Sequence, residues 1–302
     1  MLSKKVVFVI LGPTASGKSG MAVRIAKKFN GEVISADSRQ VYKGMDIGTG
    51  KITKNEMKGV PHYLLDVASP KKRFTVVQYR KLALKALKNI LKRKKIPIIC
   101  GGTGFYIESL IDGIIIPPVK PDRLLRLKLE KLSTEELFEK LKKIDPKRAK
   151  NIDKSNRRRL VRALEIVIKS GKAVPELKKE PLPYPVLFLG IKKEKEKLAI
   201  LIKKRLLKRL KQGMINEVKM LKNSGISWKK LEDFGLEYRQ IAQFLQNKIS
   251  CEEMVTGLQK DIENFAKRQM TWFKRDKRIK WIKNYKEAEA RIKNFLRKKE
   301  LA

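Results

Sequence analysis

Residues 12–19 have the types and spacing of a phosphate-binding loop, because they match GxxxxGK[ST] between a β-branched run and a helical pattern. Backbone N–H groups of such a loop wrap a phosphate, and the helix N-terminus adds its dipole. Lys18 can place a positive charge on a phosphate oxygen, and the Ser19 hydroxyl can bind Mg²⁺. The pattern therefore predicts a phosphoryl ligand with Mg²⁺, without saying which molecule. The loop residues are Gly12, Pro13, Thr14, Ala15, Ser16, Gly17, Lys18 and Ser19.

Two more polar stretches, 36–51 and 100–106, follow predicted strands at the edge where open parallel sheets bind ligands. Asp37 can hold Mg²⁺ or activate a nucleophile, or it can simply cap the next turn. Thr103 supplies a hydroxyl within a glycine-rich turn that permits close backbone approach, although a plain strand-to-helix turn has the same pattern. The polar row after Asp37 can contact a base or a sugar; it consists of Ser38, Arg39 and Gln40.

Arginine and aromatic residues gather in two later helical stretches, 156–167 and 267–276. Arginine suits planar, bidentate contact with phosphates and bases. In the second stretch Arg268 and Trp272 stand among basic residues, which suits an unpaired RNA strand. A solvated basic face in the first stretch, and a helix that packs its aromatics inward in the second, explain the patterns equally well. The arginines of the first stretch are Arg157, Arg158, Arg159 and Arg162.

These residues need a scaffold, and the hydrophobic pattern predicts an α/β fold. Strands alternate with helices, which favours a parallel sheet with right-handed crossovers. We therefore expect a P-loop parallel-sheet core, a helical insertion, and a helical C-terminal region, with 193–302 entirely helical. The predicted domains are 1–118 (first part of the core), 119–182 (insertion) and 183–302 (core completion and C-terminal helices). The predicted strands are 5–11, 31–38, 61–67, 95–104 and 185–191.

The charge balance is strongly basic. The 302 residues include 73 Lys and Arg against 31 Asp and Glu, a formal net charge of +42. Such an excess suits a polyanionic partner, although a lysine-rich surface that serves only solubility gives the same count. Cys100 and Cys251 are too few for a disulfide framework or a zinc site, and we expect the single His62 to be structural. No apolar run is long enough to span a membrane, so we expect a cytoplasmic protein.

Taken in order, "GPTASGKS", "DSRQVYKGMDIGTGK", "GGTGFYIESL", "NRRRLVRALEI" and "RQMTWFKRD" closely resemble the tRNA dimethylallyltransferase (isopentenyl-tRNA transferase) family. The resemblance runs from about residue 5 to about 285. It implies transfer of a dimethylallyl group from its diphosphate to the exocyclic amine of the adenine beside the third anticodon base. The tRNAs concerned read codons that start with U, and the products are isopentenyladenosine and diphosphate. It also implies a helical insertion that grips the anticodon stem-loop.

The resemblance also implies roles for individual residues. Asp37 would be the general base, and Lys18, Thr103 and Arg205 would act in catalysis, with Arg205 near the diphosphate. Ser19 would bind Mg²⁺, the implied cofactor. The tRNA contacts would come from Asp37, Ser38, Arg39, Gln40, Thr103, Arg126, Arg157, Arg158, Arg159, Arg162, Arg268 and Trp272. The implied partners are tRNA and dimethylallyl diphosphate, and we expect a monomer with no membrane partner.

Two other functions fit part of the pattern. A P-loop kinase of a nucleotide or small metabolite would use ATP and explain the loop and Asp37, but not the 100–106 stretch, the arginine helix or the net charge. An RNA-binding protein that uses its P-loop as a nucleotide switch would show ATP- or GTP-dependent RNA affinity without transfer chemistry. Labelled dimethylallyl diphosphate and labelled ATP distinguish the three.

Overall fold

The computed structural model describes residues 5–117, 119–176 and 178–298. The chain divides into two compact units: the sheet unit, Met1–Ile111 with Leu182–Ala302, and the insertion unit, Asp112–Pro181. The second unit therefore begins at Asp112, earlier than the boundary at 119 that we expected from the proline pair. The insertion leaves and re-enters the sheet unit at one point, because the Leu182 N–H donates to the Ile111 carbonyl at 2.9 Å.

The sheet unit is built on one parallel sheet with the strand order β3-β2-β4-β1-β5-β6. This confirms the predicted parallel α/β core, with one correction. The last strand lies in 193–302, which we predicted to be entirely helical. It has only three residues, begins with Lys280 and is followed by Lys283, so it is too short for an alternation that a sequence pattern can reveal. The strands are β1 (Val7–Leu11), β2 (Gly31–Ser35), β3 (His62–Tyr63), β4 (Ile96–Gly101), β5 (Val186–Ile191) and β6 (Lys280–Ile282).

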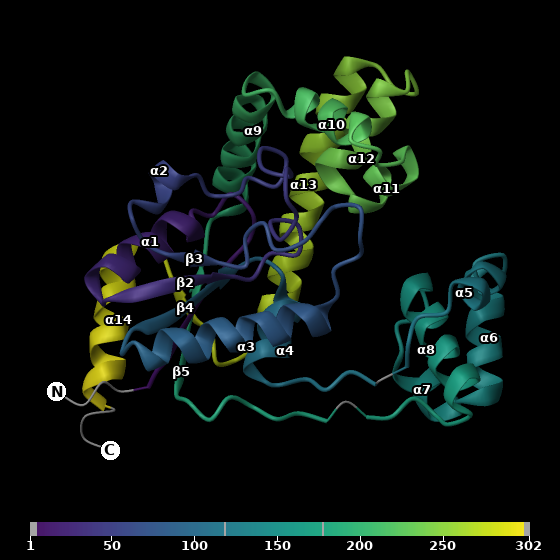
Figure 1. Ribbon diagram of the computed structural model, residues 1–302, viewed down its shortest axis with the longest axis horizontal. Coiled ribbons are helices and arrows are strands. Elements are labelled where there is room, and N and C mark those ends of the chain that lie inside the picture. The colour runs from purple at the N-terminus through teal and green to yellow at the C-terminus, as the bar shows by residue number, and fades with distance from the viewer. Residues whose placement is uncertain (1–4, 118, 177, 299–302) are drawn as a thin grey trace. The chain divides into compact units, whose positions relative to one another are not determined.

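Each face of the sheet has its own hydrophobic core, because side chains alternate along every strand. On β1, Phe8 and Ile10 face one core, where α1 (Lys18–Lys28) and α14 (Tyr285–Lys298) pack. Val7 and Val9 face the other core, which α3 (Val76–Lys92) and α4 (Gly104–Ile111) cover, as Figure 1 shows. Both central cores are fully buried, so the loops at the strand ends rest on rigid supports.

The C-terminal helices add to the second core and reach the loops of the sheet. The longest, α13 (Cys251–Phe273), starts at a capping box formed by Ser250 and Glu253. Its buried apolar residues recur every three or four positions, so one face of the helix follows the core up to Phe273. The other helices are α2 (Lys54–Met57), α9 (Lys195–Lys211), α10 (Met214–Asn223), α11 (Trp228–Phe234) and α12 (Leu236–Leu245).

The insertion unit is a small helical domain with a core of its own, built mainly from leucines such as Leu137, Leu141 and Leu164. Its helices are α5 (Arg123–Leu129), α6 (Thr134–Ile144), α7 (Pro146–Asn151) and α8 (Arg157–Ser170). Among its described residues the only strand-like pairing is an isolated bridge between Ile114 and Lys179. Throughout the described parts of the chain, we find no helix that is both long and apolar enough to cross a bilayer.

Candidate active site

The phosphate-binding loop lies between β1 and α1, as predicted. Its backbone turns sharply: Ala15 has φ 60° and Gly17 has φ 87°, and the Ser16 N–H donates to the Pro13 carbonyl at 3.3 Å. A left-handed alanine is uncommon and is kept only where the surroundings fix it. Because Gly17 caps α1 without a side-chain bond, the first N–H groups of the helix point into the loop. This is the geometry of an anion cradle.

Lys18 and Ser16 give the loop its electrostatic character. The Lys18 ammonium donates to the Pro13 carbonyl at 3.2 Å. Burial of this ammonium, together with the nearby Arg205, lowers the pKa of Lys18 to about 8. The Ser16 hydroxyl is buried and makes no hydrogen bond with any described residue. An anion in the loop would both hold Lys18 in its charged form and give this hydroxyl a partner.

Asp37 lies just after β2, and Thr103 lies just after β4. One oxygen of Asp37, Oδ1, accepts the N–H groups of Arg39 at 2.9 Å and Gln40 at 3.3 Å. These two bonds fix the carboxylate and leave Oδ2 without a hydrogen bond among the described residues. The Thr103 hydroxyl accepts the Ser38 N–H at 3.0 Å, and the Thr103 N–H donates to the Ala36 carbonyl at 3.1 Å. The two loops are thus bonded to each other directly.

Thr14 ties the phosphate-binding loop to the C-terminal helices. Its hydroxyl accepts a hydrogen bond from Arg205 of α9, and its N–H donates at 2.8 Å to Oε1 of Gln269 on α13. Burial and the neighbouring Arg209 lower the pKa of Arg205 to about 10, so this arginine is charged at neutral pH. The resemblance pointed to Arg205. Gln269 lies within the quoted stretch "RQMTWFKRD", but only basic and aromatic residues were candidates there.

The loop after Asp37 is held by acidic and aromatic residues that the sequence analysis also missed. The Glu217 carboxylate accepts the N–H groups of Asp46 at 2.8 Å, Ile47 at 2.6 Å and Gly48 at 3.1 Å, and the Tyr238 hydroxyl at 2.7 Å. Glu217 is only 8% exposed, so these bonds lie in a nearly dry site. The three N–H bonds therefore hold the backbone of residues 46–48 in place.

The far end of this loop connects back to the Asp37 turn. Arg209 donates to the Gly48 carbonyl at 3.2 Å and pairs with Glu237 at 3.3 Å. Gln40 donates to the carbonyls of Thr49 at 3.4 Å and Gly50 at 3.2 Å. Because the Gln40 N–H also binds Asp37, the position of the carboxylate depends on the whole loop.

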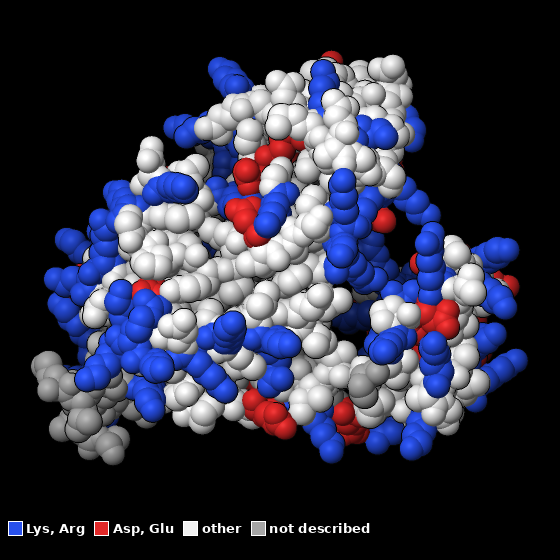
Figure 2. All heavy atoms as spheres, in the orientation of Figure 1, with Lys and Arg blue, Asp and Glu red and all other residues white. Residues whose placement is uncertain are grey.

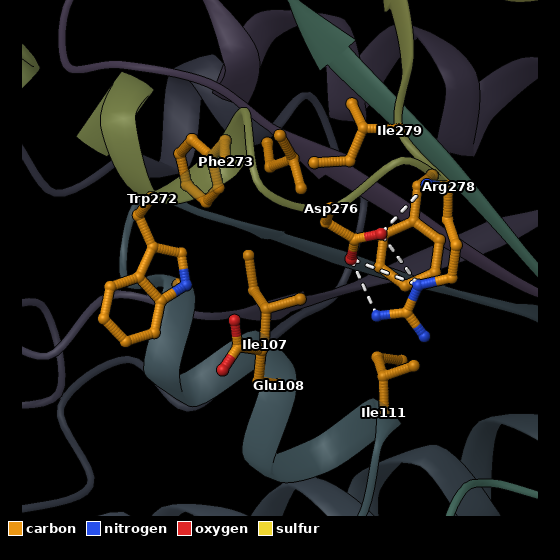
Figure 3. A pocket seen from close by; sticks show the side chains of 11 residues that line it. Ile107, Glu108, Ile111, Trp272, Phe273, Asp276, Arg278 and Ile279 are labelled. Carbon is orange, nitrogen blue, oxygen red and sulfur yellow. Dashed lines mark hydrogen bonds and ion pairs between the residues drawn. The ribbon is translucent and has the colours of Figure 1, made fainter. Parts of the chain in front are cut away.

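A small pocket lies between α4 and the end of α13 (Figure 3). Its walls include Ile107, Ile111 and Phe273. An ion pair between Asp276 and Arg278, at 2.7 Å, lines the pocket from the segment after α13. Phe273 is 3% exposed and Trp272 is half-buried, so the aromatics of 267–276 pack inward. Arg268 is exposed beside the Phe265 ring.

Within the insertion unit, three of the predicted arginines make hydrogen bonds or ion pairs with other residues of the unit, and two are exposed. Arg126 and Arg162 bind the fully buried carboxylate of Glu165, at 2.6 and 2.5 Å. Burial alone would raise the pKa of Glu165, but hydrogen bonds from Arg126, the Asp122 N–H and Arg162 lower it to about 2. Arg157 donates to the Glu130 carbonyl at 2.6 Å. The remaining two, which present their side chains to solvent, are Arg158 and Arg159.

Comparison with known proteins gives a consistent result. Residues 40–276 match the IPP transferase family. The tRNA dimethylallyltransferase of Pelotomaculum thermopropionicum is 41% identical over 295 residues, which cover 95% of this chain and 94% of the relative. The full-length tRNA isopentenylpyrophosphate transferase of Bacillus halodurans superposes with a TM-score of 0.73 at 35% identity, covering 98% of this chain and 97% of the other.

A second similar structure is that of a eukaryotic dimethylallyltransferase acting on tRNA. It has a TM-score of 0.76 at 29% identity and covers 89% of this chain and 70% of the other.

Proposed function

The chain belongs to the IPP transferase family, and we propose that it moves a dimethylallyl group from dimethylallyl diphosphate to the exocyclic amine of the adenine beside the third anticodon base of tRNA. We further propose that its tRNAs read codons that start with U and that it works as a cytoplasmic monomer. Residues 12–19 would then hold the diphosphate of a prenyl donor rather than a nucleotide. The kinase hypothesis is not favoured, because the relatives over nearly the full chain are transferases that act on tRNA.

The observation that carries the proposal is the order of three loops along the sheet edge. The loops after β1, β4 and β2 follow adjacent strands, and they carry the phosphate cradle, Thr103 and Asp37 in that order. A donor diphosphate in the cradle would therefore have its allylic carbon on the side where Thr103 and Asp37 stand. This is the arrangement that a transfer from diphosphate to an amine requires.

The chemistry follows from these positions. The adenine amine attacks the first carbon of the dimethylallyl group, the bond from that carbon to the diphosphate oxygen breaks, and the diphosphate leaves. Charge grows on the leaving group, so Lys18, Arg205 and the loop N–H groups stabilise the transition state more than the ground state. The proton of the attacking amine passes to Oδ2 of Asp37, the oxygen that makes no bond with the described residues.

The residues present fit a Mg²⁺ ion that shares the diphosphate. Ser19 follows Lys18 at the start of α1, and the described residues contain no group of three or more His, Cys, Asp or Glu that could hold a metal alone. Mg²⁺ commonly binds with one or two protein ligands and substrate phosphate oxygens. We therefore propose that the Ser19 hydroxyl is the protein ligand. When bound, the ion would neutralise charge on the leaving diphosphate.

The tRNA partner accords with the surface charge. Lys and Arg side chains cover much of the face in Figure 2, and Asp and Glu are scattered among them. The exposed Arg158 and Arg159 of α8 are suited to contact phosphates directly. Arg126 and Arg162 share Glu165, so we propose that they shape α8 and present their remaining N–H groups to the anticodon stem-loop.

The test is one incubation of the enzyme with Mg²⁺, unmodified tRNA and dimethylallyl diphosphate labelled in the prenyl group, beside a second incubation with labelled ATP. We expect label in the RNA at the adenine beside the third anticodon base. A transcript with guanine at that position is the matched control and should stay unlabelled. Absence of transfer together with consumption of ATP would overturn the proposal in favour of the kinase.

A further inference from the structure

Gln269 joins two of the loops that the proposed reaction needs. Its Oε1 accepts the Thr14 N–H of the phosphate-binding loop at 2.8 Å, and its Nε2 donates to the Gly102 carbonyl of the β4–α4 loop at 2.9 Å. The side chain is 7% exposed, and both of its polar atoms are paired. The bonds connect residues 255 and 167 positions apart, so nothing local in the sequence produces them. We call this contact the Gln269 bridge.

Two glycines leave room for α13 to approach this closely. A Cβ on Gly102 would lie 2.2 Å from Nε2 of Gln269, and a Cβ on Gly104 would lie 2.3 Å from Cδ1 of Trp272. Real contacts are never so short, so a side chain at Gly102 would displace the Gln269 side chain, and one at Gly104 would displace the Trp272 ring. Gln269 and Trp272 are three residues apart and therefore share one face of the helix. The helix thus contacts the β4–α4 loop at two successive points.

We propose that Gln269 is a positioning residue that sets the distance between the donor diphosphate and the acceptor adenine. This inference rests on the proposed transferase function. The diphosphate would be held by the phosphate-binding loop, whereas Thr103, next to Gly102, is bonded to Ser38 on the acceptor side. The Gln269 bridge connects these two sides from a helix outside the sheet. It fixes the alignment of the allylic carbon with the amine without touching either substrate.

The expected consequence of breaking the bridge is a slower chemical step with little change in affinity. Each substrate would keep its own contacts, since the cradle and the Asp37 turn remain. The two loops would shift relative to each other, and a misplacement of about 1 Å can cost on the order of 100-fold in rate. A residue that only supports folding would instead lower stability and the fraction of active molecules, and leave the rate of each active molecule unchanged.

The decisive variant is Gln269→Met, which keeps the length and helix propensity of the side chain and removes both hydrogen bonds. Gln259→Met is the matched control, because Gln259 lies on the same helix about 15 Å away, and among the described residues its side chain bonds only to Glu263. Single-turnover rates are measured at saturating tRNA and dimethylallyl diphosphate, per donor-binding site counted by titration. The Kd of each substrate is measured separately by equilibrium binding.

We expect the Gln269→Met rate per site to fall about 10- to 100-fold, with both Kd values within about threefold of wild type. A rate within twofold of wild type, or a loss found entirely in one Kd, overturns the inference. If Gln269→Met does not fold, Gln269→Glu serves: it can still accept the Thr14 N–H, but its carboxylate cannot donate to Gly102, and a wild-type rate would equally overturn the inference.

The wild-type enzyme in the same assay separates this inference from the proposed function. No transfer by wild type contradicts the function itself. Transfer by wild type and an equal rate in Gln269→Met contradict only the role of the bridge. Gln259→Met should match wild type in rate and in both Kd values. This result would show that a methionine on α13 does not by itself change the transfer rate or substrate binding.

Discussion

Replacing Glu217 with glutamine should destabilise the sheet unit and slow the enzyme. The wild-type carboxylate accepts three backbone N–H groups and the Tyr238 hydroxyl. In Glu217→Gln the amide oxygen can keep the two N–H groups of Asp46 and Ile47, and the Tyr238 hydroxyl can turn to accept from the new NH₂ group. The N–H of Gly48 then faces another donor and loses its partner, in a site that is almost closed to water.

The size of the effect follows from these four bonds. Hydrogen bonds to a charged group stabilise by roughly 1 kcal/mol more than neutral ones, and an orphaned buried N–H costs about 1–3 kcal/mol. Removing the buried charge recovers part of this through desolvation, which leaves a net loss of about 3 kcal/mol. In a unit of this size, such a loss lowers Tm by about 6–12 °C. Because the loop is bonded to Gln40, the Asp37 carboxylate should also lose its fixed orientation.

The assay is thermal unfolding followed by circular dichroism, together with single-turnover transfer at a temperature where both proteins are folded. Glu196→Gln is the matched control, since Glu196 lies exposed in the first turn of α9 and should change Tm by no more than about 2 °C. A Glu217→Gln protein that unfolds within about 2 °C of wild type and transfers at the wild-type rate would refute the reasoning.

Four further outcomes are expected. Asp37→Ala should lower the transfer rate by about 100- to 10 000-fold and leave the tRNA Kd within about threefold, and near-normal turnover would remove Asp37 from the mechanism. Lys18 is charged below its pKa of about 8 and neutral above it, and a diphosphate needs the charged form. Therefore kcat/KM for the donor should fall on the order of tenfold between pH 7 and pH 9, and a flat profile would contradict this assignment. The affinity for tRNA should fall steeply with salt, with a log–log slope of several units, whereas a flat dependence would mean that the positive charge serves solubility alone. Gly104→Ala should displace Trp272 and lower Tm, and the same change in a Trp272→Ala background should cost less because the clash is gone; equal losses in both backgrounds would show that the contact is unimportant.

Sequence patterns predicted those parts of the site that lie directly at strand ends. The phosphate-binding loop, Asp37 and Thr103 each follow a buried strand, and parallel strands deliver such residues to one edge of the sheet. Glu217 and Gln269 could not be found in this way. Each binds backbone groups about 170 or more residues away. Gln269 lies in the stretch "RQMTWFKRD" that carries part of the family resemblance, but residue type and periodicity do not distinguish it, or Glu217, from an ordinary polar residue on a helix.

The stretch 267–276 allowed two explanations from its composition: aromatics that stack on RNA, or a helix that packs its aromatics inward. In the structure Phe273 lies in the core and Trp272 is half-buried against Gly104. The RNA contacts expected of Arg268 and Trp272 stay predictions. In the insertion unit, the sequence shows the arginines Arg126 and Arg162. It does not show that both pair with the buried carboxylate of Glu165. Hydrophobic periodicity was enough to predict the fold class. The side-chain contacts of Phe273, Trp272 and Glu165 could not be predicted in this way, because they depend on which faces of distant helices pack together.

The separation between Thr14 and Gln269 also matters while the protein is being made. A ribosome completes the phosphate-binding loop early and reaches Gln269 only 255 residues later. At about 5–20 residues per second, the loop waits on the order of 10–50 s for its last partner. During that interval β1 also lacks its neighbour β5, which follows the insertion. The nascent chain therefore carries its phosphate-binding loop long before it can act as an enzyme, and prenyl transfer can begin only after α13 has been synthesised.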